Sequence, residues 1–236
     1  MIVRTSCLVA LVAALLAMLG CHHDDKVAAV AHHDDDLLPC PTHSWTTPPP
    51  LTKVELFGDA CPGLDQAACT AKCEAGDRVA CTEAGTWLGS AKTNYREQLR
   101  LYTRACELGD LLGCTNLGTT VHIDSPEWKP QKPNFACAAD LYDVTCAAGE
   151  PNGCGELAFA YLDGEGRPRD VAKAVAAFKR GCLDTRLDDI VIARGVATAC
   201  GLFLENVEAG KLGTVDPAVV KAAEAKTCDL GDCFHK

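Results

Sequence analysis

Three stretches of the sequence decide its fold, because they repeat one pattern: CEAGDRVACTEAG at 73–85, CELGDLLGCTNLG at 106–118 and CAAGEPNGCGELA at 146–158. Each has cysteine, two residues, glycine, an acidic residue, three residues and a second cysteine. The pattern becomes irregular later, where Cys182 opens a longer version and Cys228 a shorter one. Successive leading cysteines are 33, 40, 36 and 46 residues apart. Periods in this range indicate stacked pairs of helices.

The spacing of the two cysteines predicts a turn between two helices. Residues eight apart in one straight helix are separated by ~12 Å, whereas the Cα atoms of a disulfide lie ~4.4–6.8 Å apart. A disulfide within the pattern would therefore require a chain reversal. Glycine allows one, because it adopts the left-handed conformation that ends a helix. The acidic residue after it would favourably begin the next helix. The glycines are Gly76, Gly109 and Gly149, and the acidic residues are Asp77, Asp110 and Glu150.

Apolar residues with helical spacing precede each leading cysteine and follow each second cysteine. Spacings of three and four place them on one helix face, which indicates a buried core. We therefore predict that four aromatic side chains pack in the core: Tyr102, Tyr142, Phe178 and Tyr161. Together the repeats predict an all-α fold over residues 59–236, an α/α solenoid of stacked antiparallel helix pairs.

The N-terminus has the pattern of an export signal. Residues 1–20, MIVRTSCLVALVAALLAMLG, carry one early arginine and an apolar run that ends just before Cys21. This run is shorter than the ~20 apolar residues of a membrane-spanning helix. Its end, Met-Leu-Gly-Cys, resembles the lipobox of bacterial lipoproteins. The resemblance implies a lipoprotein signal peptide over residues 1–20 and a lipidated Cys21, and ordinary secretion is the alternative.

Residues 21–58 predict a flexible tether, because they are rich in histidine and aspartate, then in proline, and have no sustained apolar period. His22-His23-Asp24-Asp25 and its echo at 32–36 offer ligands that suit a transition metal. A flexible chain must lose conformational entropy to coordinate one. We therefore favour a solvated spacer over a metal site.

The sequence contains 16 cysteines and has a net charge of −10. Such a cysteine density in an exported chain indicates a disulfide framework. Zinc is the alternative, but it needs four convergent ligands, whereas these pairs recur at a repeat distance. We therefore predict no metal and no cofactor. Without a basic patch to neutralise phosphates, nucleic acid is excluded as a partner.

Residues 153–182, GCGELAFAYLDGEGRPRDVAKAVAAFKRGC, resemble the Sel-like repeat, a relative of the tetratricopeptide repeat. With the cysteines added, the chain from residue 59 onwards is similar to the helicobacter cysteine-rich proteins, exported solenoids in which one disulfide clamps each unit. This resemblance implies four pairs: Cys73–Cys81, Cys106–Cys114, Cys146–Cys154 and Cys182–Cys200. Further bridges could involve Cys61, Cys69, Cys228 and Cys233, with Cys61 and Cys69 sharing the eight-residue spacing. Cys40 and Cys137 could pair with each other or stay free.

The resemblance implies two alternative functions. Sel-like proteins are commonly scaffolds, and stacked helices form a concave face that suits peptides or proteins. We therefore expect a scaffold in the bacterial cell envelope (periplasm, outer membrane or cell surface) that contacts the membrane only through its lipid. Members of the helicobacter group have been associated with penicillin binding and weak β-lactamase activity, which implies a hydrolase that binds β-lactams or cell-wall fragments.

The residues themselves favour the scaffold. No serine is followed three residues later by lysine, and GSAKTN around Ser90 only superficially resembles β-lactamase motifs. Zinc-enzyme signatures such as His-Glu-x-x-His are also absent from the sequence. We therefore predict no catalytic residues, and we name Trp87 and Trp128 as candidate contact residues, with a place in the core as an equal alternative for Trp87.

Overall fold

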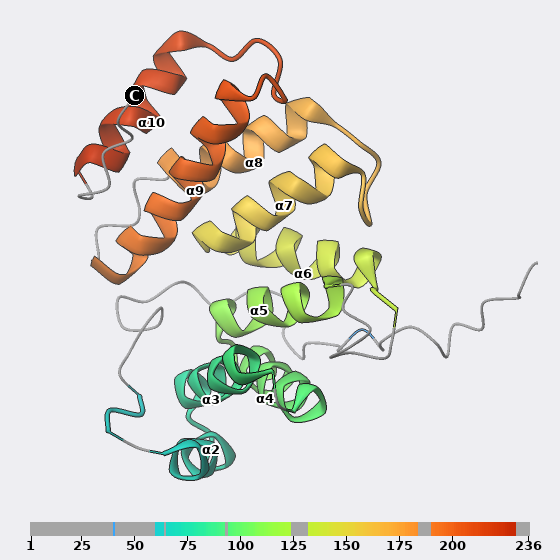
Figure 1. Ribbon diagram of the computed structural model, residues 1–236, viewed down its shortest axis with the longest axis vertical. Coiled ribbons are helices and arrows are strands. Elements are labelled where there is room, and N and C mark those ends of the chain that lie inside the picture. Colours follow the sequence, from blue (N-terminus) through green and yellow to red (C-terminus); the bar gives the residue numbers. More distant parts are fainter. Residues whose placement is uncertain are drawn as a thin grey trace, which may run out of the picture. The chain divides into compact units, whose positions relative to one another are not determined.

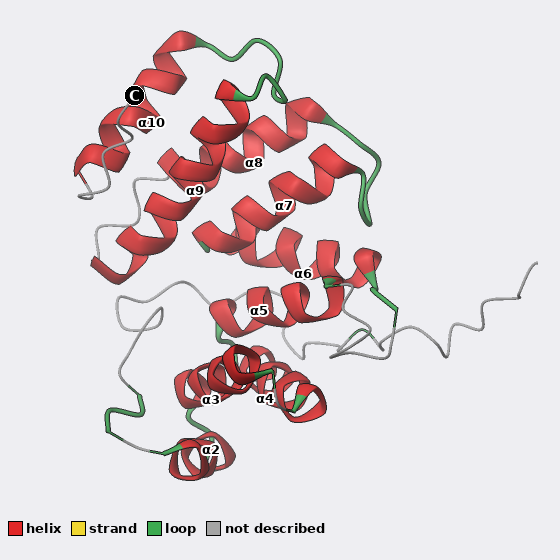
Figure 2. Cartoon of the chain, in the orientation of Figure 1, coloured by secondary structure: helices red, strands yellow, loops and turns green. Residues whose placement is uncertain are grey.

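The computed structural model describes Cys40 and residues 60–63, 65–92, 94–123, 132–183 and 190–229. All of these belong to one compact unit, residues 35–236. The predicted signal peptide, residues 1–20, and the predicted tether, residues 21–58 apart from Cys40, lie outside the described residues. Within the described ranges the regular elements are α-helices (Figure 2), and none of these helices is long and apolar enough to span a membrane.

Successive helices along the chain pack against each other (Figure 1). They are α2 (Gln66–Glu74), α3 (Arg78–Ala91), α4 (Tyr95–Glu107), α5 (Leu111–His122), α6 (Phe135–Ala148), α7 (Pro151–Asp163), α8 (Val171–Leu183), α9 (Ile190–Glu208) and α10 (Pro217–Asp229). Contacts between alternate helices divide them into two layers. One layer contains α3, α5, α7 and α9. In the other layer α2 contacts α4, and α8 contacts both α6 and α10. Each antiparallel pair therefore supplies one helix to each layer, as in an α/α solenoid.

The cysteine pattern forms the turn between one pair and the next. Its glycine is left-handed, with φ angles of 101°, 89° and 93° at Gly76, Gly109 and Gly149. The acidic residue after it is the N-cap of the next helix, and its carboxylate accepts backbone N–H groups of the first turn. These caps are Asp77 for α3, Asp110 for α5 and Glu150 for α7.

A disulfide crosses each turn, with Cα atoms 4.4 to 4.5 Å apart. The pairs are Cys73–Cys81, Cys106–Cys114, Cys146–Cys154 and Cys182–Cys200. They join α2 to α3, α4 to α5, α6 to α7 and α8 to α9. These are the four pairs that the family resemblance implies, and each links one helix pair to its neighbour.

Two further disulfides hold residues on the N-terminal side of the helices. Cys61 is joined to Cys69 of α2, and Cys40 is joined to Cys137 in the first turn of α6, with Cα atoms 5.5 and 5.4 Å apart. The structure therefore pairs Cys40 with Cys137, one of the two alternatives left open by the sequence. Cys228 lies near the end of α10, and Cys233 lies outside the described residues. Any bridge that involves these two cysteines stays a prediction.

Aromatic side chains fill the core between the two layers. Tyr102, Tyr142 and Phe178 are at most 4% exposed, as their helical spacing predicts. Tyr161 differs, because it is only half-buried, and the Lys173 ammonium lies 5.3 Å from the centre of its ring. This tyrosine is near the end of α7, where its ring is shared between the core and solvent.

Candidate functional site

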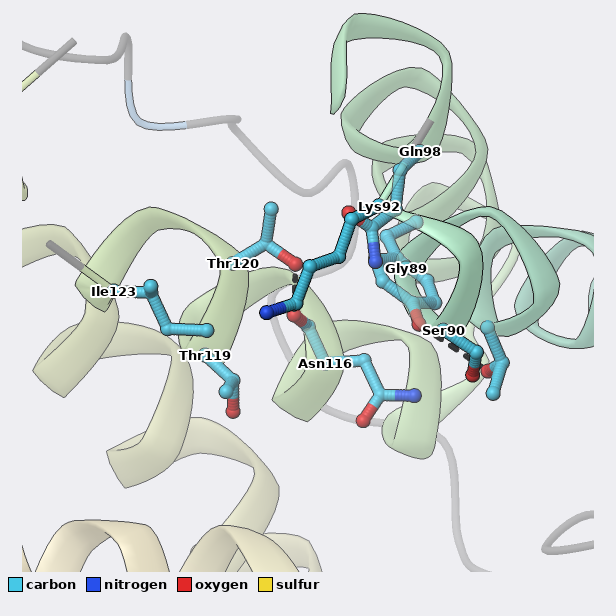
Figure 3. A pocket seen from close by; sticks show the side chains of 10 residues that line it. Gly89, Ser90, Lys92, Gln98, Asn116, Thr119, Thr120 and Ile123 are labelled. Carbon is cyan, nitrogen blue, oxygen red and sulfur yellow. Dashed lines mark hydrogen bonds between the residues drawn. The ribbon is translucent and has the colours of Figure 1, made fainter. Parts of the chain in front are cut away.

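A cavity of about 420 Å³ lies between α3 and α5, and its lining also includes residues of α4 (Figure 3). It is lined by Thr86, Gly89, Ser90, Lys92, Gln98, Tyr102, Asn116, Thr119, Thr120 and Ile123. We call this cavity the α3–α5 groove. Seven of these ten residues carry a hydroxyl or amide group, and Lys92 is the one cation among the described lining residues.

Tyr102, which lines the groove, and Tyr142, one repeat further on, pack against helix backbone. Each tyrosine comes from the second layer, four residues before a leading cysteine, and covers a glycine of the first layer. A Cβ atom at Gly85 would lie 2.7 Å from Cε1 of Tyr102, and one at Gly118 would lie 2.5 Å from Cε1 of Tyr142. Both distances are too short for any side chain, so glycine lets the ring rest on the helix.

The residue after this glycine suits the ring that packs beside it: threonine meets a tyrosine hydroxyl, and phenylalanine meets a phenylalanine ring. Thr86 Oγ1 and the Tyr102 hydroxyl are 3.2 Å apart, and the Tyr142 hydroxyl donates to Thr119 Oγ1 at 3.4 Å. In the third repeat Phe159 takes the place of the threonine and meets the aromatic ring of α8 edge-on, with centroids 5.5 Å apart. Burial raises the pKa of both tyrosines, so both stay protonated.

The cap carboxylates of α5 and α7 connect neighbouring repeats, a role that the sequence analysis did not predict. Asp110 and Glu150 are 1% and 0% exposed. Thr82 donates a hydrogen bond to Asp110, and Thr115 donates one to Glu150 at 2.7 Å. Burial raises the pKa of both carboxyl groups, to about 7 for Asp110. Each buried acid therefore acts at the contact between two repeats as well as at a helix end.

Several polar groups in the groove have no partner among the described residues, including the Oε1 atom of Gln98, which is buried. Lys92 ends α3 with a left-handed φ of 49°, uncommon for a residue with a side chain, and extends towards α5 (Figure 3). The carboxamide of Asn116 also lines the groove. Among the described residues neither side chain makes a hydrogen bond or an ion pair. Ile123 adds an apolar contact surface, since it is 37% exposed at the rim.

The corresponding space between α5 and α7 is occupied by His122. This residue follows the second cysteine of its repeat by eight positions, where the preceding repeat has Gly89. Its ring contacts Phe135 edge-on, with centroids 5.1 Å apart, and lies 6.4 Å from the Tyr142 ring. Its Nε2 is 2.7 Å from a carboxylate oxygen of Glu165, in the loop after α7. At Gly89, in the preceding repeat, the buried side chain of Gln98 from α4 lies where a Cβ atom would be.

The other predicted or considered sites lie either outside the described residues or away from the groove. Cys21, the His/Asp-rich tether and Trp128 lie outside the described residues, and Trp87 is 37% exposed on α3 but does not line the groove. Among the described residues, one set of potential metal ligands gathers closely: Cys61, Cys69 and Glu83. Those two cysteines form a disulfide, whereas metal binding requires thiolates.

No protein-family model and no curated protein matches this sequence. The crystal structure of a Sel1 repeat protein from Oxalobacter formigenes is similar, with 19% identity and a TM-score of 0.56. The match covers 69% of this chain and 61% of that protein, so the chain spans less than two thirds of it. Cysteine rich protein B of Helicobacter pylori is 23% identical over 61% of this chain and 99% of its own, with a TM-score of 0.42.

The similarity to the Sel1 repeat protein confirms the fold predicted from the cysteine pattern. The described residues form an all-α solenoid with the fold of that Sel1 repeat protein, and disulfides cross-link its helix pairs.

Proposed function

We propose that this protein is an exported scaffold that binds a protein partner in the α3–α5 groove and is held at the cell envelope by a lipidated Cys21. The observation that carries the proposal is the groove itself, an open space of about 420 Å³ in which the Asn116 amide and the Lys92 ammonium group have no partner among the described residues. A few directed polar groups around a concavity are typical of binding sites. The disulfides support export, because they persist in oxidising compartments.

Site-specific photo-crosslinking in the native cells tests partner binding. A photoreactive amino acid replaces Ser90, which lines the groove, and in a control it replaces Lys179, an exposed residue of α8. We expect a covalent adduct with one defined protein from position 90 and none from position 179. Equal labelling at both positions, or no adduct at position 90, would contradict the proposal.

Cell fractionation tests the anchor. Each buried methylene of an acyl chain contributes ~0.8 kcal/mol to membrane binding, so a protein with several acyl chains should remain with the membranes. Mass spectrometry of the N-terminal peptide should show acylation of Cys21, and Cys21→Ala should move the protein to the soluble fraction. A wild-type protein that is already soluble and unacylated would favour ordinary secretion.

The second candidate function is a hydrolase that binds β-lactams or cell-wall fragments. Its support is that Ser90 and Lys92 line the same groove, although no hydrogen bond joins them. The described lining also contains no histidine or carboxylate that could act as a base. Incubation with a fluorescent penicillin decides the matter: an adduct on the wild type that Ser90→Ala abolishes would favour this function, and an unlabelled protein would exclude acylation.

A further inference from the structure

The disulfide between Cys40 and Cys137 differs from the others in its exposure to solvent. Six disulfides join cysteines of the described residues, and among these cysteines only Cys40 is exposed. The others are at most 3% exposed. Thiol–disulfide exchange begins when a thiolate attacks one of the two sulfur atoms, so it requires access to that atom. Cys40 therefore makes this disulfide the accessible one of the six.

The position of Cys137 suits it to leave when Cys40 is attacked. Cys137 is the third residue of α6, a helix of 14 residues. The N-terminus of a helix stabilises negative charge through its backbone N–H groups and its dipole. A thiolate that is stabilised in this way is displaced faster from a disulfide. The accessible sulfur and the favourable leaving group are therefore the two ends of the same bond.

A second attachment holds the chain to the solenoid after Cys40. The carboxylate of Glu83, on α3, accepts hydrogen bonds from the N–H groups of Ala60 and Cys61 at 2.9 and 3.0 Å. Lys72 donates to the carbonyl oxygen of Ala60. The disulfide of Cys61 with α2 adds a covalent link. The chain would therefore stay attached at Ala60 after the first disulfide has been reduced.

The two attachments differ in the length of chain that separates them from Cys21. Cys40 lies 19 residues after Cys21, and Ala60 lies 39 residues after it. At ~3.3–3.6 Å per residue, an extended chain spans at most about 65 Å over 19 residues and about 135 Å over 39 residues. Reduction of the Cys40–Cys137 disulfide would therefore about double the greatest distance between Cys21 and the solenoid.

We propose that the Cys40–Cys137 disulfide is an exchange site for a thioredoxin-like dithiol protein, and that its reduction lengthens the tether. A thiolate of the partner attacks the sulfur of Cys40 and forms a mixed disulfide, while Cys137 leaves as a thiolate and takes up a proton. The second thiol of the partner then displaces Cys40. The partner ends as a disulfide, because it has supplied the two electrons and two protons that leave Cys40 and Cys137 as thiols. The greater reach of the solenoid rests on the proposed anchor at Cys21, whereas the exchange itself does not.

Thioredoxin is the probe for the exchange, in a form whose resolving cysteine is replaced by serine so that the mixed disulfide persists. Incubated with the full-length, oxidised protein, it should be trapped on Cys40, and peptide mapping identifies the attached cysteine. The double variant Cys40→Ser, Cys137→Ser should yield no trapped complex, and circular dichroism confirms that it is folded. Attachment to Cys137, or equal attachment to cysteines of the cross-turn disulfides, would overturn the inference.

Reduction rates within the wild-type protein provide a comparison that needs no variant. Unaltered thioredoxin is supplied with NADPH and thioredoxin reductase, and the thiols that form are alkylated at intervals and quantified by mass spectrometry. Cys40 and Cys137 should become reduced at least ~10-fold faster than Cys146 and Cys154, because both sulfur atoms of the second pair belong to buried residues. Equal rates for the two pairs would contradict the proposed exchange site.

Energy transfer between dyes at residues 22 and 147 measures the length of the tether. Ala147 is exposed in the last turn of α6, and unnatural amino acids carry both dyes, so that no cysteine is added. Transfer should become less efficient on reduction and reach the value of the double variant Cys40→Ser, Cys137→Ser. The double variant itself should not respond to the reductant. An efficiency that reduction leaves unchanged in the wild type would overturn the lengthening.

Failure of the anchor and failure of this inference give different results. A soluble, unacylated wild type in which thioredoxin is trapped on Cys40 would overturn the anchor and support the exchange site. An acylated protein in which thioredoxin attaches equally to all disulfides would support the anchor and overturn the exchange site.

Discussion

Close contact between neighbouring repeats depends on residues that have no side chain. Tyr102 and Tyr142 each lie against a glycine of the preceding repeat, and their hydroxyl groups meet a threonine one residue further along. The third repeat uses a phenylalanine pair instead. The ring and the residue that meets it therefore change together in size and polarity from repeat to repeat. Neither residue can be replaced without the other.

Gly118→Ala should destabilise the protein by about 1–2 kcal/mol. Overpacking against Tyr142 costs roughly 1–3 kcal/mol, and the better helix propensity of alanine returns up to ~1 kcal/mol. Gly201→Ala is the matched control, because a Cβ atom there would meet nothing within 4 Å. It should stabilise α9 by up to ~1 kcal/mol. Urea unfolding of the oxidised proteins measures both, and equal effects of the two substitutions would contradict the packing argument.

The sequence could predict the tyrosines but not the residues that receive them. Helical spacing places Tyr102 and Tyr142 on a buried face, and the structure confirms this. The glycine beneath each ring lies in the preceding repeat, so finding it requires knowledge of how two repeats align in space. The contact of Gln98 with Gly89, one turn after the Tyr102 contact, lies outside the cysteine motif for the same reason.

At the level of single helices, the caps illustrate what a short motif can predict. Glycine followed by an acidic residue correctly indicates where α3, α5 and α7 begin. It does not reveal that two of the caps are buried against the preceding repeat. The sequence does contain a sign of this contact, because Thr82 and Thr115, which bond to the two caps, both directly follow a second cysteine. Their hydrogen bonds make each cap part of the contact between repeats.

The buried caps should make the protein more stable at mildly acidic pH than at alkaline pH. Asp110 has a pKa of about 7 in the folded protein, against ~3.9 in an unfolded chain, and burial raises the pKa of Glu150 in the same direction. The folded state therefore holds these protons more tightly. Their stabilising contribution is complete below pH ~4 and is lost as the pH rises through about 7.

Thermal unfolding between pH 4 and 8 measures this dependence. Asp110→Asn, which is neutral throughout, should flatten the decline between pH 5 and 8. Asp77→Asn is the control, because Asp77 caps α3 in the same way but is only half-buried. It should leave the profile of the wild type unchanged. A wild-type stability that rises over this range would contradict the assignment to buried carboxyl groups.

Across the whole molecule, disulfides compensate for the small core of each repeat, since a repeat contacts only its neighbours. Cys146 and Cys154 are separated by 8 residues. On the chain-entropy account, closing a loop of this length stabilises by about 2.5 kcal/mol. Replacing both cysteines by alanine should lower the free energy of unfolding by that amount.

The same double substitution at Cys61 and Cys69 provides the comparison, because their separation is also 8 residues. Urea unfolding under non-reducing conditions should give similar losses for the two pairs. A pair that can be removed without loss would show that chain entropy is not the source of its effect.

The disulfide between Cys40 and Cys137 also governs how the protein bears mechanical load. It bridges 97 positions of the sequence, and helices α2 to α5 with the groove lie inside the covalent ring that it closes. Tension between the two ends of the chain would pass through the disulfide, so these helices would bear no load. Reduction of this bridge and those nested within it should release about 320–350 Å of extra length under single-molecule stretching. Until then, tension on the N-terminal end would not unfold the helices that form the groove.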